Sequence, residues 1–413
     1  MPFHPQSPGE EISERDGSSI EPHPQPEIPH APHHHRDLDS IFIGPHGLRV
    51  GWSILLFAAL YYLFREVIGT LFYFAGLIHD TPADSAGAVL IAEFVPFLAL
   101  VCAALIMVVI EDRSVDQSID QSPDRDPNPN IGPSIAGRIL SYNLIGPRRV
   151  RHFLSGLAAG FAALSLLIGA LACGGWLRLG ATSLPAAQAL INGALWALAF
   201  LLIGSVEEGL FRCYSLSTLT RGINFWWALT AQIGLCLFLA LTGEGNGAWG
   251  VYIAAAVGFF PCLILHQKSA AHPESCARNA FWQAAWVTSS FFGFYHTSNS
   301  GENWIGVLAA AFIGFVFCVS VRVTGSVWWA IGCHAAWDWA ETFFYGAADS
   351  GFQGQGHFLS ANSAGNPLWS GGSDGPEGSL LVLGVVLLLL LFLLALYARN
   401  QSESREVAEQ LAG

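Results

Sequence analysis

Long apolar stretches with few or no charges recur along most of the chain. Two of them, Ala88 to Ile110 and Ser379 to Ala398, hold the roughly 20 residues that a helix needs to cross the hydrocarbon core of a bilayer. The stretches of this kind are 52–78, 88–110, 153–173, 187–220, 225–242, 248–266, 280–296, 304–321, 326–345 and 379–398. The pattern predicts an all-α fold, a polytopic transmembrane bundle of about ten helices, and therefore a multi-pass integral membrane protein.

Arginine residues are distributed unevenly between the connections. The connection 111–151 contains six arginines, and Arg221, Arg278 and Arg322 fall on the same side of the membrane if the stretches alternate. The opposite connections contain only Arg178. Because cations accumulate in cytoplasmic loops, the sequence predicts that both termini are cytoplasmic. The expected location, a bacterial inner or plasma membrane, depends instead on the resemblance described below.

Several segments lack the apolar pattern. Residues 1–45 are rich in Pro, His, Glu and Ser and include a run of three histidines, so we interpret them as a disordered cytoplasmic tail. The connection 111–151 is interpreted as a cytoplasmic linker, and 346–378, rich in Gly, Ser and Asn, as an outer loop. The remaining predicted parts are two N-terminal helices in 50–110, a main intramembrane bundle in 152–345, a last transmembrane helix in 379–398 and a cytoplasmic tail in 399–413.

The composition excludes several classes of protein. Hydrophobic residues make up 52% of the chain and charged residues only 12%, against roughly 25% charged residues in soluble domains. The net charge is -13 and Lys268 is the only lysine, so we do not expect a nucleic-acid partner. The expected surroundings of the protein are the lipid bilayer. The eight cysteines form no C-x-x-C pair, which argues against a disulfide framework and a zinc ribbon.

Ionisable residues inside the apolar stretches are the candidates for function, because a charge in the membrane is costly and usually faces the interior of the bundle. The candidates are Arg65, Glu66, Glu93, Glu207, Glu208, Arg212, His296, His334, Asp338 and Glu341. An ion pair or a structural hydrogen bond accounts for Arg65, Glu66 and Glu93. The other candidates fall in three short strings, 207–212, 292–296 and 334–338, or just beyond the last of them.

Helical spacing orients the side chains within these strings. Glu208 and Arg212 are four residues apart and can form an ion pair, which leaves Glu207 rotated by about 100° toward a different neighbour. The other residues that share a helical face are Phe292 with His296, and His334 with Asp338 and Glu341.

The predicted depths of four residues in the membrane agree. A rise of about 1.5 Å per residue, counted from the arginines at the cytoplasmic boundary, places Glu207 and Asp338 roughly 20 Å, His296 roughly 25 Å and His334 roughly 15 Å deep. One layer then holds two carboxyl groups and two imidazoles. Groups of this kind can activate a water and stabilise a developing negative charge.

The three strings together resemble a known family. Its pattern is E-E-x-x-x-R, then F-x-x-x-H, then H-x-x-x-N/D, each on its own helix, and all three occur here in that order. The chain therefore resembles the CPBP family of intramembrane endopeptidases, the CAAX-protease and bacteriocin-processing group, which includes the type II CAAX prenyl endopeptidases and abortive infection proteins. The resemblance covers about residues 190 to 345.

The resemblance implies the role of each residue. Glu207, helped by His296, would activate a water, while His334 and Asp338 would stabilise the tetrahedral oxyanion. The supporting residues would be Glu208, Arg212, Phe292 and Glu341. The implied activity is hydrolysis of a peptide bond in a membrane-associated protein or peptide, by a protease that needs no cofactor.

Two features depart from the family pattern. The inserted segment 222–279 separates the first string from the second, where many members have one short loop; its two apolar stretches preserve the orientation of the later helices. Asp338 stands where the prenyl-protease branch usually has Asn, which weakens the transfer of that branch's substrate.

Three alternative interpretations stay open. In a zinc protease, His296, His334 and Asp338 would bind Zn²⁺ and Glu207 would be the base, although the helical H-E-x-x-H pattern is absent. In a transporter, the same buried charges would line a pathway. A membrane scaffold could retain the fold without catalysis.

Overall fold

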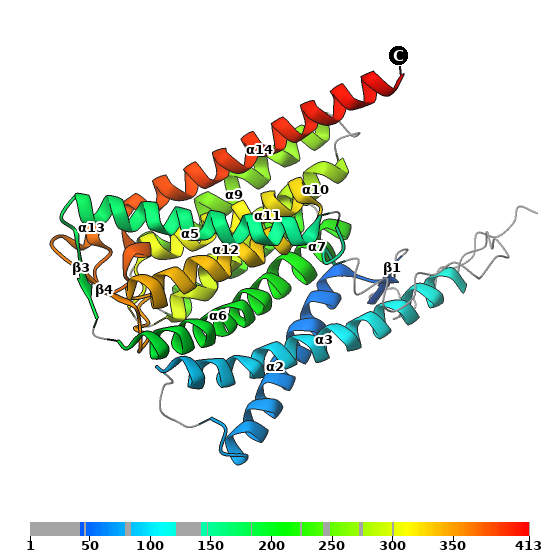
Figure 1. Cartoon of the computed structure of the whole chain (residues 1–413). Coiled ribbons are helices and arrows are strands. Elements are labelled where there is room, and N and C mark those ends of the chain that lie inside the picture. The colour runs from blue at the N-terminus through cyan, green and yellow to red at the C-terminus, as the bar shows by residue number, and fades with distance from the viewer. Residues whose placement is uncertain are drawn as a thin grey trace, which may run out of the picture.

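The structure is a computed structural model that describes residues 42–44, 47–78, 84–120, 142–146, 148–182, 184–223, 225–242, 248–271, 276–299 and 301–412. The His-rich part of the predicted tail and most of the predicted linker 111–151 lie outside these ranges. Figure 1 shows that most of the described chain is helical.

Helices cover every apolar stretch identified above. The helices are α2 (Val50–Phe74), α3 (Ala86–Asp120), α5 (Arg149–Cys173), α6 (Ala186–Glu208), α7 (Leu216–Gly222), α8 (Phe225–Thr242), α9 (Ala248–Ala271), α10 (Cys276–Tyr295), α11 (Trp304–Thr324), α12 (Trp328–Asp338) and α14 (Leu380–Ala412). The predicted insert corresponds to α8 and α9. Helix α14 extends into the segment 399–413 that the sequence suggests is a tail, and α3 extends into the predicted linker.

Five helical segments are long and apolar enough to span a membrane within the described part of the chain, which supports a multi-pass membrane protein. They are Val50–Phe74, Ala86–Glu111, Arg149–Cys173, Ala186–Gly222 and Trp304–Thr324. The shorter apolar helical segments are Phe225–Leu237 and Leu380–Leu396. The count of about ten spans and the orientation of the termini stay predictions.

Glycines bring α5 and α12 into direct backbone contact. A Cβ atom at Gly156 or Gly160 of α5 would collide with the carbonyl oxygens of Trp329 and Cys333 on α12, respectively. Small residues at such positions allow two helices in a membrane to approach closely. This contact fixes the position of α12, and His334 directly follows Cys333 on that helix.

The fold is mostly helical, in agreement with the predicted fold class, and also contains two small antiparallel strand pairs. Strand β3 (Leu177–Ala181) pairs antiparallel with β4 (Leu359–Ser363), and a second small pair joins β1 (Ile43–Gly44) to β2 (Gly47–Leu48). Strand β4 lies in the predicted outer loop, which also contains the short helices α13 (Pro367–Ser370) and η5 (Pro376–Gly378). Backbone polar groups beyond a helix end need partners, and the pairing of β3 with β4 supplies them.

Candidate active site

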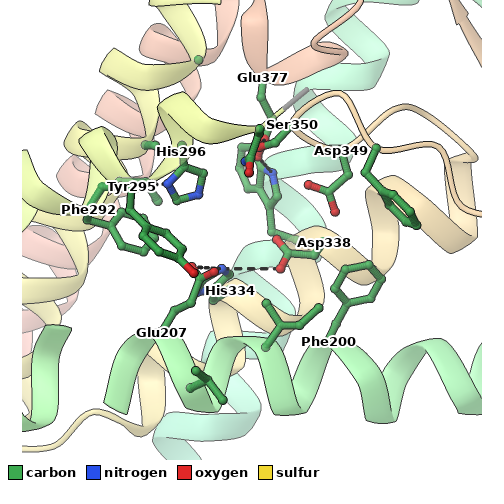
Figure 2. Close-up of a pocket in the computed structure, with 18 of the residues that line it drawn as sticks. Phe200, Glu207, Phe292, Tyr295, His296, His334, Asp338, Asp349, Ser350 and Glu377 are labelled. Atoms are coloured by element: carbon green, nitrogen blue, oxygen red, sulfur yellow. Dashed lines mark hydrogen bonds and ion pairs between the residues drawn. The ribbon is translucent and has the colours of Figure 1, made fainter. Parts of the chain in front are cut away.

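A cavity of about 900 Å³ lies between the helices. Residues from the N-terminal pair α2 and α3, from α6, α10, α11 and α12, and from the predicted outer loop 346–378 line it. The lining includes all four residues of the predicted catalytic set: Glu207, His296, His334 and Asp338. Figure 2 shows their side chains together with their neighbours.

Three of these four residues meet around one imidazole ring. The Nε2 atom of His334 lies 3.7 Å from Oε2 of Glu207 and 3.5 Å from Oδ2 of Asp338, as the dashed lines in Figure 2 mark. His334 and Asp338 are one turn apart on α12, whereas Glu207 comes from the end of α6. The predicted convergence of Glu207, His334 and Asp338 in one layer therefore agrees with their contacts.

Glu208 orients the same imidazole from its other side. Its Oε1 atom lies 3.0 Å from Nδ1 of His334 and 3.2 Å from Nη1 of Arg212, and the Glu208 and Arg212 side chains are fully buried. The ion pair expected from helical spacing is present, and it is completed by a contact with His334 that the spacing did not reveal. Since a carboxylate oxygen only accepts, Nδ1 of His334 donates to Glu208, which directs Nε2 toward the cavity.

Phe292 covers the buried cation. The guanidinium carbon of Arg212 lies 4.1 Å from the centre of the Phe292 ring, a cation–π geometry. The same ring makes an edge contact with His334 at 6.0 Å between centroids. Phe292 thus belongs with Glu208 and Arg212 among the residues that hold His334.

His296 faces the cavity from a different wall. Its Nδ1 atom lies 2.8 Å from the carbonyl oxygen of Phe292 and donates to it, so Nε2 stays available for the cavity. Although Glu207 and His296 line the same space, no hydrogen bond or ion pair joins these two described residues. In Figure 2 the two side chains approach from separate helices.

Glu341 does not extend the catalytic face as expected. The α12 helix changes at Trp339 into a π-helical segment, η4 (Trp339–Tyr345), and the wider turn removes the 3.6-residue spacing on which the expectation depended. Glu341 instead accepts a hydrogen bond from Trp337 Nε1 at 3.0 Å. A second π segment, η1 (Gly209–Ser215), follows Glu208 directly.

Sequence reasoning missed several lining residues. Tyr295 reaches toward Glu207 in Figure 2 and lines the cavity; its position next to His296 was the available signal. Asp349, Ser350 and Glu377 line the cavity from the predicted outer loop, where polar residues are ordinary and carry no signal.

Further acidic residues lie near the cavity, outside the predicted spans. Burial, followed by the charges of Asp374 and Glu377, raises the pKa of Glu302 to about 9. Burial and the charge of Glu377 raise the pKa of Asp374 to about 8. Both carboxyl groups are therefore protonated more readily than in water.

The residues of the zinc alternative do not form a compact ligand group in the described structure. His334 and Asp338 are close, but His296 hydrogen-bonds to its own helix, and the one group of three His, Cys, Asp or Glu residues with the proximity needed to hold a metal ion comprises Glu341, Asp349 and Glu377. The prediction that the enzyme needs no metal stays a prediction.

A comparison with known proteins finds a match, over part of the chain, to the family that the motifs suggest. Residues 272–340 match the family model described as type II CAAX prenyl endopeptidase Rce1-like. Neither the search of curated proteins nor the search of solved structures returned a match. The matched segment contains the second and third strings and begins at residue 272, just after the two helices of the insert, so the first string lies outside it. The match confirms the resemblance to the CAAX-protease family, through helices α10 to α12.

Proposed function

We propose that this protein is an intramembrane endopeptidase that hydrolyses a peptide bond in a membrane-associated protein or peptide. The family match points to a CAAX-type intramembrane protease. The finer assignments, the mechanism and the class of substrate, are supported by the arrangement of the cavity.

One observation carries the proposal. Glu207 lies outside the matched segment and is separated from it by the two-helix insert, yet its carboxyl group lies 3.7 Å from His334, a residue inside the match. The insert therefore interrupts the motif in the sequence without separating its parts in space. The cavity is therefore lined by two carboxyl groups with an imidazole between them, and such a set of groups is suited to hydrolysis.

In the proposed reaction, Glu207 accepts a proton from a water whose oxygen attacks the peptide carbonyl carbon. Nε2 of His334 and the side chain of Asp338 donate hydrogen bonds to the resulting oxyanion. The tetrahedral intermediate then breaks its C–N bond, and Glu207 returns the proton to the leaving amine. The products are a carboxylic acid and an amine, which then exchange a proton to give a carboxylate and an ammonium group, and one water is consumed.

The contacts of His334 determine which protonation state of its imidazole this scheme requires. Nδ1 donates to Glu208, so Nε2 can donate to an oxyanion only if His334 is doubly protonated. The carboxylates of Glu207 and Glu208 beside the ring favour that state, while Asp338 must be neutral in order to donate. His296, which faces the cavity separately, would hold the attacking water, because its Nε2 atom can accept a hydrogen bond from it.

The test is Glu207→Gln, which keeps the shape of the side chain and removes the base. Membrane-protein termini would be compared in cells that make the wild type or this variant, and peptides spanning the differences would then be tested with purified protein. We expect turnover to fall by about 10²-fold to 10⁴-fold. The matched control is Glu93→Gln. Glu93 also lines the cavity but forms no hydrogen bond or ion pair with any of the four proposed catalytic side chains in the described structure.

Equal turnover by the wild type and Glu207→Gln would refute the role of Glu207. Elemental analysis distinguishes a metal-dependent hydrolysis from the proposed one. If active protein contains one zinc per chain, and if zinc and activity are lost together and restored by added zinc, the mechanism is zinc-dependent.

A further inference from the structure

A second group of carboxyl groups lies at the cavity, in addition to the proposed catalytic set: Asp349 and Glu377 line the cavity, and Glu341 is buried behind them. Glu341 comes from η4, Asp349 from the segment after it and Glu377 from η5. One oxygen atom from each lies within 4.8 Å of the others. Figure 2 shows Asp349 and Glu377 on the side of the cavity away from Glu207.

The most buried member of this group has an unused oxygen. Glu341 is 0% exposed, and its Oε1 atom has no hydrogen-bond partner in the described structure. Its other oxygen accepts from Trp337 Nε1, which also donates to Oε1 of Glu377 at 2.7 Å. A single N–H group therefore donates to two carboxyl groups. The buried Oε1 atom of Glu341 still lacks the partner that such an atom normally has.

The remaining contacts of the group supply no positive charge. Thr342 donates to Oδ2 of Asp349, and Ser350 donates to Oε2 of Glu377, each at 3.0 Å. No lysine or arginine of the described chain forms an ion pair with the three acids. By contrast, the buried Glu208 has Arg212 beside it.

The donor atoms and their spacing define the class of ligand. Ca²⁺ binds oxygen atoms at about 2.3 to 2.6 Å, so two oxygens on opposite sides of one ion are separated by roughly 4.8 Å, and all three acids fit within one coordination shell. Mg²⁺ requires a smaller and more regular arrangement. We propose that Glu341, Asp349 and Glu377 bind a divalent cation that prefers oxygen ligands, and that this cation is Ca²⁺.

A cation at this position would join three segments beside the cavity. Asp349 and Glu377 lie near the two ends of the predicted outer loop 346–378, and Glu341 lies three residues after Asp338. Binding would fasten both ends of that segment to η4. The proposal does not depend on the proposed hydrolysis, because binding is measured without substrate.

The experiment uses the purified full-length protein in detergent, treated with a chelator, dialysed free of it and titrated with CaCl₂ or MgCl₂ at constant ionic strength. Calorimetry measures the affinity for each ion, and the unfolding temperature measures how much ion binding stabilises the folded protein. We expect saturable Ca²⁺ binding at about 10⁻⁵ to 10⁻³ M, a rise of roughly 5 °C at saturation, and a smaller effect of Mg²⁺.

The double variant Asp349→Asn, Glu377→Gln should weaken Ca²⁺ binding at least tenfold and remove the rise. In chelator it should unfold at a temperature no lower than the wild type, because two mutually repelling acids are gone. The single variant Asp349→Asn provides the same test if the double variant does not fold. The control Asp84→Asn removes another acid that lines the cavity but does not belong to the group, and should leave the Ca²⁺ effect unchanged.

Three outcomes would overturn the proposal. The absence of saturable Ca²⁺ binding to the wild type would remove the site, and a rise that persists in the folded variants would place the effect elsewhere. A larger effect of Mg²⁺ than of Ca²⁺ would overturn the assignment of the ion.

Discussion

Two groups of acids border the same cavity and are neutralised in opposite ways. In the proposed catalytic group, Glu207, Glu208 and Asp338 surround His334, and Arg212 pairs with Glu208. In the second group, the hydrogen bonds that Glu341, Asp349 and Glu377 receive from described side chains come from an indole and two hydroxyl groups. The first group therefore has Arg212 and His334 in contact with its acids, whereas no Lys or Arg of the described chain forms an ion pair with the second.

This comparison predicts different responses to the loss of one acid. Buried charges are tolerated when paired, and removing one partner leaves an uncompensated charge. In the second group no cation is left behind, so removal of an acid relieves repulsion instead. The three predictions below test the difference, in order of expected effect.

The largest effect is expected at Glu208. Glu208→Gln leaves the fully buried Arg212 without its anion, and breaking such a pair costs roughly 3 to 5 kcal/mol. The unfolding temperature in detergent should fall accordingly. The neighbouring change Glu207→Gln is the matched control and should be much milder, because the Glu207 side chain is 18% exposed and its one ion pair within the described structure is with His334.

A second variant separates the loss of the pair from damage to packing. The double change Glu208→Leu, Arg212→Met removes both charges and should regain a large part of the stability lost in Glu208→Gln. If Glu208→Gln instead unfolds like the wild type and is inactive, the roles of Glu207 and Glu208 are exchanged.

The next effect concerns Asp338. Asp338→Leu removes a hydrogen-bond donor to the oxyanion and should lower turnover by about 10²-fold to 10³-fold. Asp338→Asn keeps a donor in nearly the same place and should stay within about tenfold of the wild type. Turnover of the peptide substrates, measured at one pH in one detergent, checks both. An inactive Asn variant beside an active Leu variant would show that Asp338 does not act as a donor.

The positions of helices were predictable because apolar length and spacing are local properties of the sequence. The ion pair of Glu208 with Arg212 followed from the same spacing. The contact of Glu208 with His334 could not be predicted from this spacing, because it joins residues 126 positions apart and depends on how α6 packs against α12. The glycine contacts of α5 with α12 are non-local in the same way.

Other features could not be predicted from the sequence, for different physical reasons. The π segments η1 and η4 alter the helical period, so Glu341 leaves the face that its position i+7 from His334 suggested. Strand β4 and the acids Asp349 and Glu377 lie in a Gly- and Ser-rich segment with no periodicity. Their arrangement arises from tertiary pairing with β3 and η4, which local patterns do not encode.

The smallest effect is expected from the pH dependence of stability, which samples the acids near the second group. Burial raises the pKa of Glu302 to about 9 from its ordinary value near 4.5. A raised pKa in the folded state means that the folded protein binds more protons than the unfolded chain, so stability is lost as the pH rises from about 4.5 through about 9. Asp374 and Glu377 face Glu302 and strengthen the effect.

Glu302→Gln removes one titrating group and should therefore reduce the fall in unfolding temperature between about pH 6 and pH 10. The slope should not vanish, because Asp374, with a pKa of about 8, still titrates in the same direction. The measurement is made in chelator, so that no metal ion competes with protons, and Asp84→Asn serves as the control acid. A steeper slope in Glu302→Gln than in the wild type would mean that Glu302 is stabilised as an anion, which would make this region resemble the paired group around His334 instead of contrasting with it.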